Sequence, residues 1–224
     1  MGATLALNFA MVYMGDNVED FGNQALPTTR PKPLPTLNPV LKVNAQDKDK
    51  WTLVDFSTQK TFQISDPDSD KKQIKGMDWD LGFQRTKVIS NGGVTNPEGK
   101  VGIANLGPVD FNSLMALPET QYVADVRSWG NVNNPSIVDW YLYRTRTHNI
   151  ESKRNVYLVK TGDGYLKLRI LNYYCQKAES ECKSSMCSRD EAACLSLEYQ
   201  HISTDQKAFP PPPAPSTRVS QVSP

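Results

Sequence analysis

Residues 155–174 read NVYLVKTGDGYLKLRILNYY, and this stretch decides the fold class. Within it, Leu166–Ile170 (LKLRI) alternates strictly between apolar and basic side chains. A period of two residues is typical of a β-strand that buries one face and exposes the other, here the face of Lys167. The segment Thr161–Gly164 (TGDG) is a strong signal for a tight turn between two strands. The stretch therefore predicts a β-hairpin whose leucine face lies in the core.

The same alternation recurs at several places between residues 46 and 205. The further segments with a strand pattern are Trp51–Phe56, Thr61–Ser65, Trp79–Phe83, Thr86–Ile89 and Leu195–His201. Only Asp110–Leu117 (DFNSLMAL) has a helical pattern, with Asp110 in position to cap the helix and Pro118 to end it. The sequence thus predicts an all-β fold, a mainly antiparallel β-sheet domain with one short helix.

Both ends of the chain differ in composition from this central part. Prolines recur between residues 27 and 39, and residues 209–215 read FPPPPAP. Such proline-rich segments favour an extended or disordered chain over a packed core. We therefore predict three parts: an N-terminal segment and linker over residues 1–45, a β domain over 46–205 and a disordered proline-rich tail over 206–224.

The first residues contain an apolar run, Ala3–Met14, that is interrupted only by Asn8. It is too short to span a bilayer, so we expect no transmembrane span. It resembles the apolar core of a secretory signal, although no Lys or Arg precedes it and no clear cleavage site follows. Two interpretations stay open: a truncated signal, or a frayed or misplaced N-terminus.

The charge of the chain is nearly balanced. Its 25 basic residues offset 24 acidic ones, which gives a net charge of +1. A nucleic-acid partner or an anionic membrane surface would favour a basic excess. We therefore expect no nucleic-acid partner.

The sequence offers little support for an enzyme. It contains two histidines, His148 and His201, and neither a G-x-S-x-G nor an H-E-x-x-H motif. The pair Gly92–Gly93 is not followed by the start of a helix, which a phosphate-binding loop requires. We expect no catalytic activity.

Two acidic groups resemble catalytic or calcium sites, but each has a simpler explanation. Asp78 and Asp80 alternate with apolar residues, as side chains on the surface of a strand do. Residues 66–70 (DPDSD) resemble the start of a calcium loop, but Lys71 and Met77 stand where that loop needs Gly and Glu. A surface strand and a solvated turn are the better interpretations.

The four cysteines form a specific local pattern, since all lie within residues 175–194. If the strand that ends at Cys175 pairs with the one that begins at Cys194, the two sulfurs face each other. Cys182 and Cys187 would then close a small ring at the loop tip. We predict both disulfides, which favour an oxidising compartment. A four-cysteine zinc site is the alternative, although only the inner pair approaches the usual ligand spacing.

Four blocks of the sequence, in order, resemble the HmuY-like family of haem-binding proteins. The blocks are WDLGFQRTKVISNGGVT (79–95), DFNSLMALP (110–118), the hairpin region 140–174 and CLSLEYQHI (194–202). Gly82 departs from the family pattern, which has a small alanine at this place. Together the blocks cover most of residues 50–202.

The resemblance implies an exported all-β protein of Gram-negative bacteria, located in the periplasm, at the outer-membrane surface or outside the cell. Some members of the family sequester haem, without catalysis, and pass it to outer-membrane receptors. Haem, such a receptor and haemoproteins are therefore the expected partners. The second hypothesis is a scaffold without haem that serves as a protein- or glycan-binding surface module, because a fold does not fix a function.

The resemblance also implies how haem would be held. In the haem binders of the family, two His or Met side chains hold the iron from both faces, and both groups are good ligands for haem iron. His148 stands where the family motif has a histidine, in the block THNIESKRNVYLVKT. The remaining candidates are His201, Met115 and Met77 as ligands. Tyr141, Tyr143, Tyr173 and Tyr174 would suit either a porphyrin pocket or a contact patch. The second ligand stays open.

Overall fold

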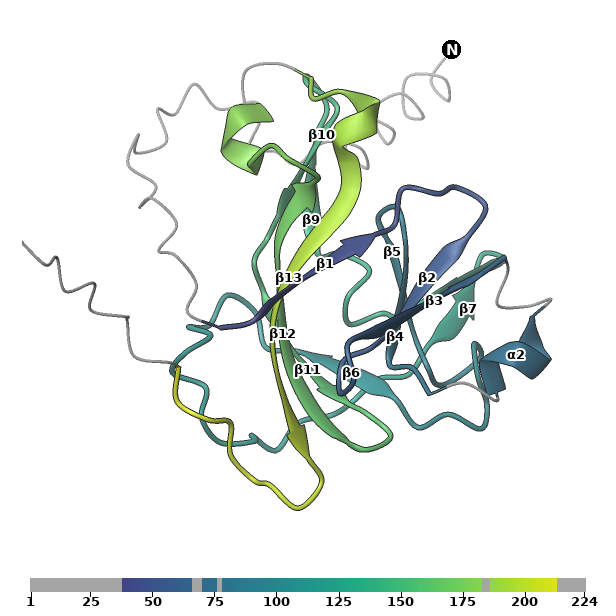
Figure 1. The fold of residues 1–224 in the computed structure, drawn as a ribbon, viewed down its shortest axis with the longest axis vertical. Coiled ribbons are helices and arrows are strands. Elements are labelled where there is room, and N and C mark those ends of the chain that lie inside the picture. The colour runs from purple at the N-terminus through teal and green to yellow at the C-terminus, as the bar shows by residue number, and fades with distance from the viewer. Residues whose placement is uncertain (1–37, 66–69, 76–77, 183–185, 213–224) are drawn as a thin grey trace, which may run out of the picture.

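The predicted hairpin forms the middle of a five-stranded antiparallel sheet (Figure 1). This computed structural model describes residues 38–65, 70–75, 78–182 and 186–212. The sheet has the order β1-β13-β12-β11-β6, and its strands are β1 (Val40–Asn44), β6 (Gly102–Asn105), β11 (Val156–Lys160), β12 (Gly164–Tyr174) and β13 (Ala192–Ser203). Lys160 lies opposite Tyr165 across the predicted turn, and β13 pairs along the other edge of β12. The predicted hairpin and last strand are thus confirmed.

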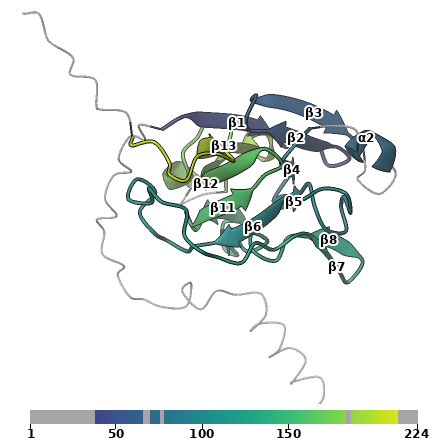
Figure 2. The same ribbon diagram turned by 90° about the horizontal axis from the view of Figure 1, so that it is seen from below.

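A four-stranded antiparallel sheet in the order β3-β2-β4-β5 lies beside the first (Figure 1). Its strands are β2 (Trp51–Asp55), β3 (Lys60–Ile64), β4 (Leu81–Gln84) and β5 (Lys87–Ser90). Two small hairpins complete the β-structure, formed by β7 (Val126–Ser128) with β8 (Asn131–Asn133) and by β9 (Tyr141–Arg144) with β10 (Asn149–Ser152). Figure 2 shows β7 and β8 at the outer edge of the molecule, next to β5. The all-β, mainly antiparallel prediction is confirmed.

The core lies between the two main sheets. Apolar side chains of β2 and β4 pack against those of β12 and β13, among them Val54, Phe83, Leu168 and Leu197. The ring of Phe56 contacts that of Tyr199 edge-on, with 5.4 Å between their centres. Burial of these side chains is the main force that holds the sheets together.

The predicted helix over Asp110–Leu117 is wrong. Residues 111–113 form a turn, in which the Asp110 carboxylate accepts hydrogen bonds from the amides of Asn112 and Ser113. Ala116 then pairs with Ala208 in an isolated antiparallel bridge, so tertiary pairing replaces a second helical turn. The helical segments that the structure describes are short: α2 (Lys71–Lys75), η2 (Glu179–Cys182) and η3 (Arg189–Glu191). In this described part, no helix is long and apolar enough to cross a membrane.

The basic face of β12 is buried, contrary to the simple alternation. Lys167 is 1% exposed, and its ammonium group donates hydrogen bonds of 2.8 Å to the carbonyl oxygens of Phe111 and Leu114. It also lies over the rings of Phe111 and Phe209, at 4.5 and 4.8 Å from their centres. Burial lowers the pKa of Lys167 to about 8. Two loop segments therefore cover a face that the sequence pattern assigns to solvent.

The folded part extends beyond the predicted limits of 46 and 205. β1 pairs with β13 along its whole length, from Val40 opposite Glu198 to Asn44 opposite Cys194. Phe209 is 2% exposed, and its amide donates to the Met115 carbonyl oxygen. β1 follows the last proline of the linker, so every residue in it can join the ladder. Residues 1–37 and 213–224, the DPDS segment 66–69 and Met77 lie outside the described residues.

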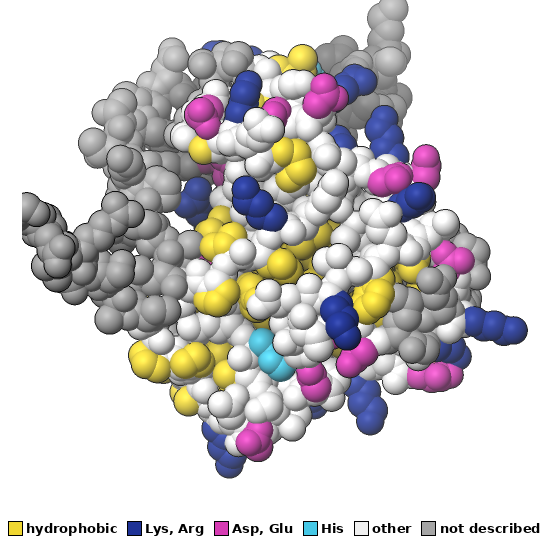
Figure 3. All heavy atoms as spheres, viewed as in Figure 1, with side chains coloured by type: hydrophobic (Ala, Val, Ile, Leu, Met, Phe, Trp, Pro, Cys, Tyr) yellow, Lys and Arg dark blue, Asp and Glu magenta, His cyan; other side chains and the backbone are white. Residues whose placement is uncertain are grey.

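Acidic and basic side chains alternate over the face in Figure 3, and no single sign dominates it. This distribution agrees with the nearly balanced charge of the chain. A nucleic-acid interface would require a basic patch or stripe. The face in view has none.

Asp80 is buried, so its assignment to the strand surface is wrong, whereas Asp78 is exposed. Asp80 is 4% exposed, and its carboxylate accepts a hydrogen bond of 2.9 Å from the Phe56 amide. Burial raises the pKa of Asp80 to about 7, and the nearby Asp163 and Asp55 add to the rise. The carboxylate thus links the start of β4 to the end of β2. Burial of its charged form costs free energy.

We predict that this cost makes stability depend on pH. Between 3.8 and about 7 the folded protein keeps a proton on Asp80 that the unfolded chain has released. The free energy of unfolding therefore falls as the pH rises through this window. Asp80→Asn keeps an acceptor for the Phe56 amide and carries no charge. At about pH 8 the variant should be more stable than the wild type by up to roughly 4 kcal/mol.

Urea unfolding of both proteins at about pH 4 and about pH 8 measures this difference. Other groups that titrate in the same window, Glu179 among them, cancel in the comparison because both proteins contain them. An equal difference at the two pH values would show that Asp80 does not titrate as described.

Candidate functional site

His148 ends the turn between β9 and β10. Its backbone has a φ of +54°, in the left-handed region, and its side chain is exposed. Nδ1 of its ring lies 2.5 Å from the hydroxyl oxygen of Tyr143. Tyr143 belongs to β9, opposite Ile150 of β10, so the hairpin ladder positions both residues. The hydrogen bond leaves Nε2 of the imidazole available to a ligand.

His148 borders a hollow of about 430 Å³, which we call the His148 hollow. Three parts of the chain line it: the turn between β4 and β5, the β9–β10 hairpin with the end of β12, and the segment from Met186 to the first residue of β13. The residues that matter most for its chemistry are Arg85, Tyr143, His148, Tyr173, Tyr174, Met186 and Arg189. This volume lies in the range of ligand pockets in proteins.

Two successive tyrosines of β12 line this hollow, which a regular strand would not allow. Neighbouring side chains of a strand point to opposite faces. The pairing of β12 with β13 shifts register between Ile170 and Asn172 and again between Asn172 and Tyr174. Such irregularities redirect side chains and are common next to binding sites. Tyr173 and Tyr174 are accordingly both buried and both in the lining.

The electrostatics of the hollow favour an anionic ligand. Arg85 and Arg189 line it, and none of the described lining residues is acidic. Burial raises the pKa of the Tyr173 and Tyr174 hydroxyls, so both remain neutral, although the charge of Arg85 opposes the rise at Tyr173. The Tyr174 oxygen accepts a hydrogen bond of 2.9 Å from the Ile150 amide. The hollow thus combines aromatic surface with positive charge.

The structure places only some of the predicted site residues in this hollow. His148 and Tyr143 line it, whereas Tyr141 is half-buried and contacts the ring of Trp140 outside it. His201 lies at the opposite end of β13, opposite Leu166, and its Nε2 is 3.2 Å from the Asp163 carboxylate. Met115 is half-buried under the C-terminal segment. Neither His201 nor Met115 is part of the lining.

Met186 is the main residue that the sequence analysis missed. Its side chain is 66% exposed at the His148 hollow, inside the ring that the inner disulfide closes. The only sequence signal for it was its place between Cys182 and Cys187. Arg85 carried no signal at all, because its position depends on contact between strands far apart in the sequence.

Both predicted disulfides are present. Cys175 and Cys194 join the end of β12 to β13, with Cα atoms 4.6 Å apart. Cys182 and Cys187 close the loop between these strands, with Cα atoms 5.4 Å apart. Because all four sulfurs are bonded in pairs, the four-cysteine zinc site is wrong.

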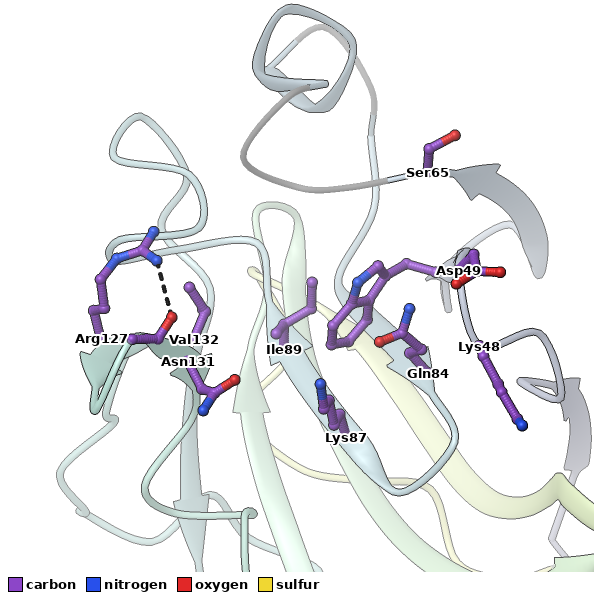
Figure 4. Close-up of a pocket in the computed structure, with 11 residues that line it drawn as sticks. Lys48, Asp49, Ser65, Gln84, Lys87, Ile89, Arg127, Asn131 and Val132 are labelled. Atoms are coloured by element: carbon purple, nitrogen blue, oxygen red, sulfur yellow. Dashed lines mark hydrogen bonds between the residues drawn. The ribbon is translucent and has the colours of Figure 1, made fainter.

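A second hollow of about 320 Å³ lies on the four-stranded sheet, and we call it the Trp51 hollow (Figure 4). Figure 4 shows Lys48 and Arg127 on opposite sides of it, with Ile89 between them. Its described lining contains no His, Cys or Met. It therefore lacks the nitrogen and sulfur ligands that haem iron takes in most haem proteins.

Comparison with known proteins supports one family. The sequence profile of the family described as HmuY protein matches residues 47–186. Comparison with curated proteins found no match.

Solved structures give the same picture of the fold. A structure described as that of an HmuY-like heme binding protein from Bacteroides vulgatus is 22% identical and superposes with a TM-score of 0.53, over 73% of this chain and 91% of that one. The apo HmuY analog of Tannerella forsythia is 15% identical, with a TM-score of 0.54 over 78% and 96% of the two chains. Apo PinO from Porphyromonas gingivitis is 16% identical, with a TM-score of 0.54 over 74% and 97%.

The profile match covers more than half of the chain and includes the β9–β10 hairpin, both tyrosines of β12 and Met186. The solved structures share the architecture that carries these residues. This chain therefore belongs to the HmuY family.

Proposed function

We propose that the protein binds haem in the His148 hollow, with His148 and Met186 as the two ligands of the iron. The observation that carries the proposal is that an imidazole and a thioether from separate parts of the chain line one hollow. Both are established haem ligands, and the His/Met pair raises the reduction potential of the iron. Membership of the HmuY family, and one similar structure whose description names heme binding, support the same cofactor.

The contact between Tyr143 and His148 suits an imidazole ligand. A histidine that binds metal through one nitrogen usually donates the hydrogen on the other, which fixes the tautomer and the ring plane. Here Nδ1 would carry the hydrogen and donate it to the Tyr143 oxygen, and Nε2 would face the iron. Tyr143 would therefore orient the ligand without touching the metal.

The rest of the lining suits the remainder of a porphyrin. Tyr173 and Tyr174 offer aromatic surface to the ring. The guanidinium groups of Arg85 and Arg189 would pair with the two propionate carboxylates, since arginine binds carboxylates with paired hydrogen bonds. No described residue of the lining would repel these carboxylates. The residues present therefore fit haem.

We further propose that the protein sequesters haem outside the cytoplasm for uptake through an outer-membrane receptor, without catalysis. Two disulfides favour an oxidising compartment such as the periplasm, the outer-membrane surface or the medium. A hollow with exposed candidate ligands favours transfer of the cofactor to a partner, whereas the chemistry at the iron in haem enzymes depends on the polarity and steric access of the distal pocket.

Haem titration tests the ligand assignment. Wild-type protein should bind haem saturably, with a Soret band of a six-coordinate His/Met complex. His148→Ala and Met186→Ala should each remove one axial ligand, change the spectrum and weaken binding on the order of tenfold or more. His201→Ala and Met115→Leu serve as matched controls, because neither residue lines the hollow. Unchanged spectra in both ligand variants would contradict the assignment.

A second candidate function, a glycan-binding surface module, is favoured by one specific observation. Trp129 is 98% exposed at the turn between β7 and β8, and tryptophan is enriched among the residues that contribute most to binding at interfaces. The next residues, Gly130 and Asn131, line the Trp51 hollow, whose described lining has three basic residues, Lys48, Lys87 and Arg127, and one acidic residue, Asp49. Aromatic surface beside these cations suits an acidic glycan.

Tryptophan fluorescence tests this second function. If it holds, a heparin oligosaccharide should change the emission of the wild type saturably, and neutral dextran should not. Trp129→Ala should lose at least most of the response, whereas Met186→Ala, in the other hollow, should keep it. Emission that heparin leaves unchanged in the wild type would reject the glycan-binding function.

A further inference from the structure

Met186 lies outside the strands, so no backbone ladder fixes its position. It lies in the loop between β12 and β13, in the ring closed by Cys182 and Cys187. The disulfide ties Cys182 to Cys187, but it does not fix where these two residues lie relative to the β9–β10 hairpin. A thioether ligand is useful only if its distance from the opposite ligand is set within narrow limits.

The side chain of Asn149 bonds to both ends of this ring. Its Nδ2 donates to the carbonyl oxygen of Cys182, and its Oδ1 accepts a hydrogen bond of 3.0 Å from the amide of Cys187. Asn149 is 5% exposed and Cys182 is 1% exposed, so water competes little for these bonds. One amide side chain thus holds the ring at its two closing residues.

Asn149 is also the neighbour of His148 in the chain. It is the first residue of β10, and its backbone pairs with Arg144 of β9. The next residues strengthen the same strand: the Ile150 amide donates to Tyr174, and the Ser152 amide donates to the Glu179 carboxylate at the start of η2. The segment that carries His148 is therefore bonded both to the floor of the hollow and to the cysteine loop.

We propose that Asn149 and the Cys182–Cys187 ring form a positioning device that sets Met186 at the correct distance from His148. This inference deepens the proposed haem function and rests on it. Asn149 itself lines the His148 hollow, but both polar atoms of its side chain bond to the ring residues, so its proposed role is to hold the backbone of the ring. An amide is the suitable group, because it combines one acceptor and one donor at the reach that the two ring residues require.

If Asn149 holds the ring in this way, the effect should be measurable by hydrogen exchange in the protein without haem. The Cys187 amide should exchange its hydrogen slowly in the wild type, because it donates to a buried acceptor. In Asn149→Ala the exchange of this amide should become faster by an order of magnitude or more. Asn172→Ala is the matched control, since Asn172 bonds to Tyr174 and Lys177 on the other side of the loop. Fast exchange in the wild type would overturn the inference.

Haem titration then measures the effect on the ligand. Asn149→Ala, and the double variant Cys182→Ser with Cys187→Ser, should bind haem on the order of 10- to 100-fold more weakly and lose the spectral signature of the Met ligand. Asn149→Asp should also weaken binding, because a carboxylate cannot donate to the Cys182 oxygen. The control is the double variant Cys175→Ser with Cys194→Ser, which removes the outer disulfide and leaves the ring closed.

The outcomes separate the two proposals. If the wild type binds no haem, the proposed function is wrong and the positioning role falls with it. If the wild type binds haem and the ring variants bind it with the same affinity and spectrum, only the positioning role is overturned. Circular dichroism and thermal unfolding of each variant show whether it is folded. A weaker affinity in folded ring variants, with an unchanged outer-disulfide variant, supports the inference.

Discussion

The ladder between β12 and β13 is the interaction on which the rest of the structure depends. These strands have 11 and 12 residues, and every other strand of the five-stranded sheet extends outward from them. One face of the pair carries the leucines that pack against the second sheet, and the other holds Lys167 under two loops. At one end the ladder becomes irregular, and because of that irregularity the side chains of Tyr173 and Tyr174 both line the His148 hollow. The scaffold and the site therefore share one set of backbone hydrogen bonds.

Much of this fold could be predicted, because a period of two residues is a local property. Seven strands (β2 to β5 and β11 to β13), the TGDG turn and both disulfides follow from neighbouring residues or from one pairing of strands, whereas β1 and β6 to β10 were not predicted. The errors at Lys167, Asp80 and Asp110 have a common cause: segments far away in the sequence pack over these residues or pair with the chain beside them. Lys167 and Asp80 are buried because a loop or a second sheet lies over them, and no local pattern contains that information. The expected helix at Asp110 gives way to a turn because Ala116 meets Ala208, more than ninety positions later in the chain.

The candidate site was less predictable than the fold. His148 was found through a resemblance, and Tyr143 as an aromatic residue suited to line a porphyrin. Met186 and Arg85 were missed, because they reach the hollow from a polar insert and from a turn of the other sheet. His201 and Met115 had suitable chemistry, but they lie elsewhere in the fold. Ligand chemistry is visible in a sequence, whereas convergence of ligands depends on tertiary structure.

The candidate ligands lie outside the buried scaffold, which explains how such a fold can persist at low sequence identity. Structures that are 15–22% identical share this architecture with TM-scores of 0.53 and 0.54. His148 and Met186 are exposed and lie in a turn and a loop, so their replacement costs little packing energy. Tyr174 and Asn149 are buried and hydrogen-bonded, and their loss would leave polar groups without partners. Replacement of the two proposed iron ligands would therefore destabilise this scaffold little, whereas replacement of the residues proposed to position them would destabilise it more.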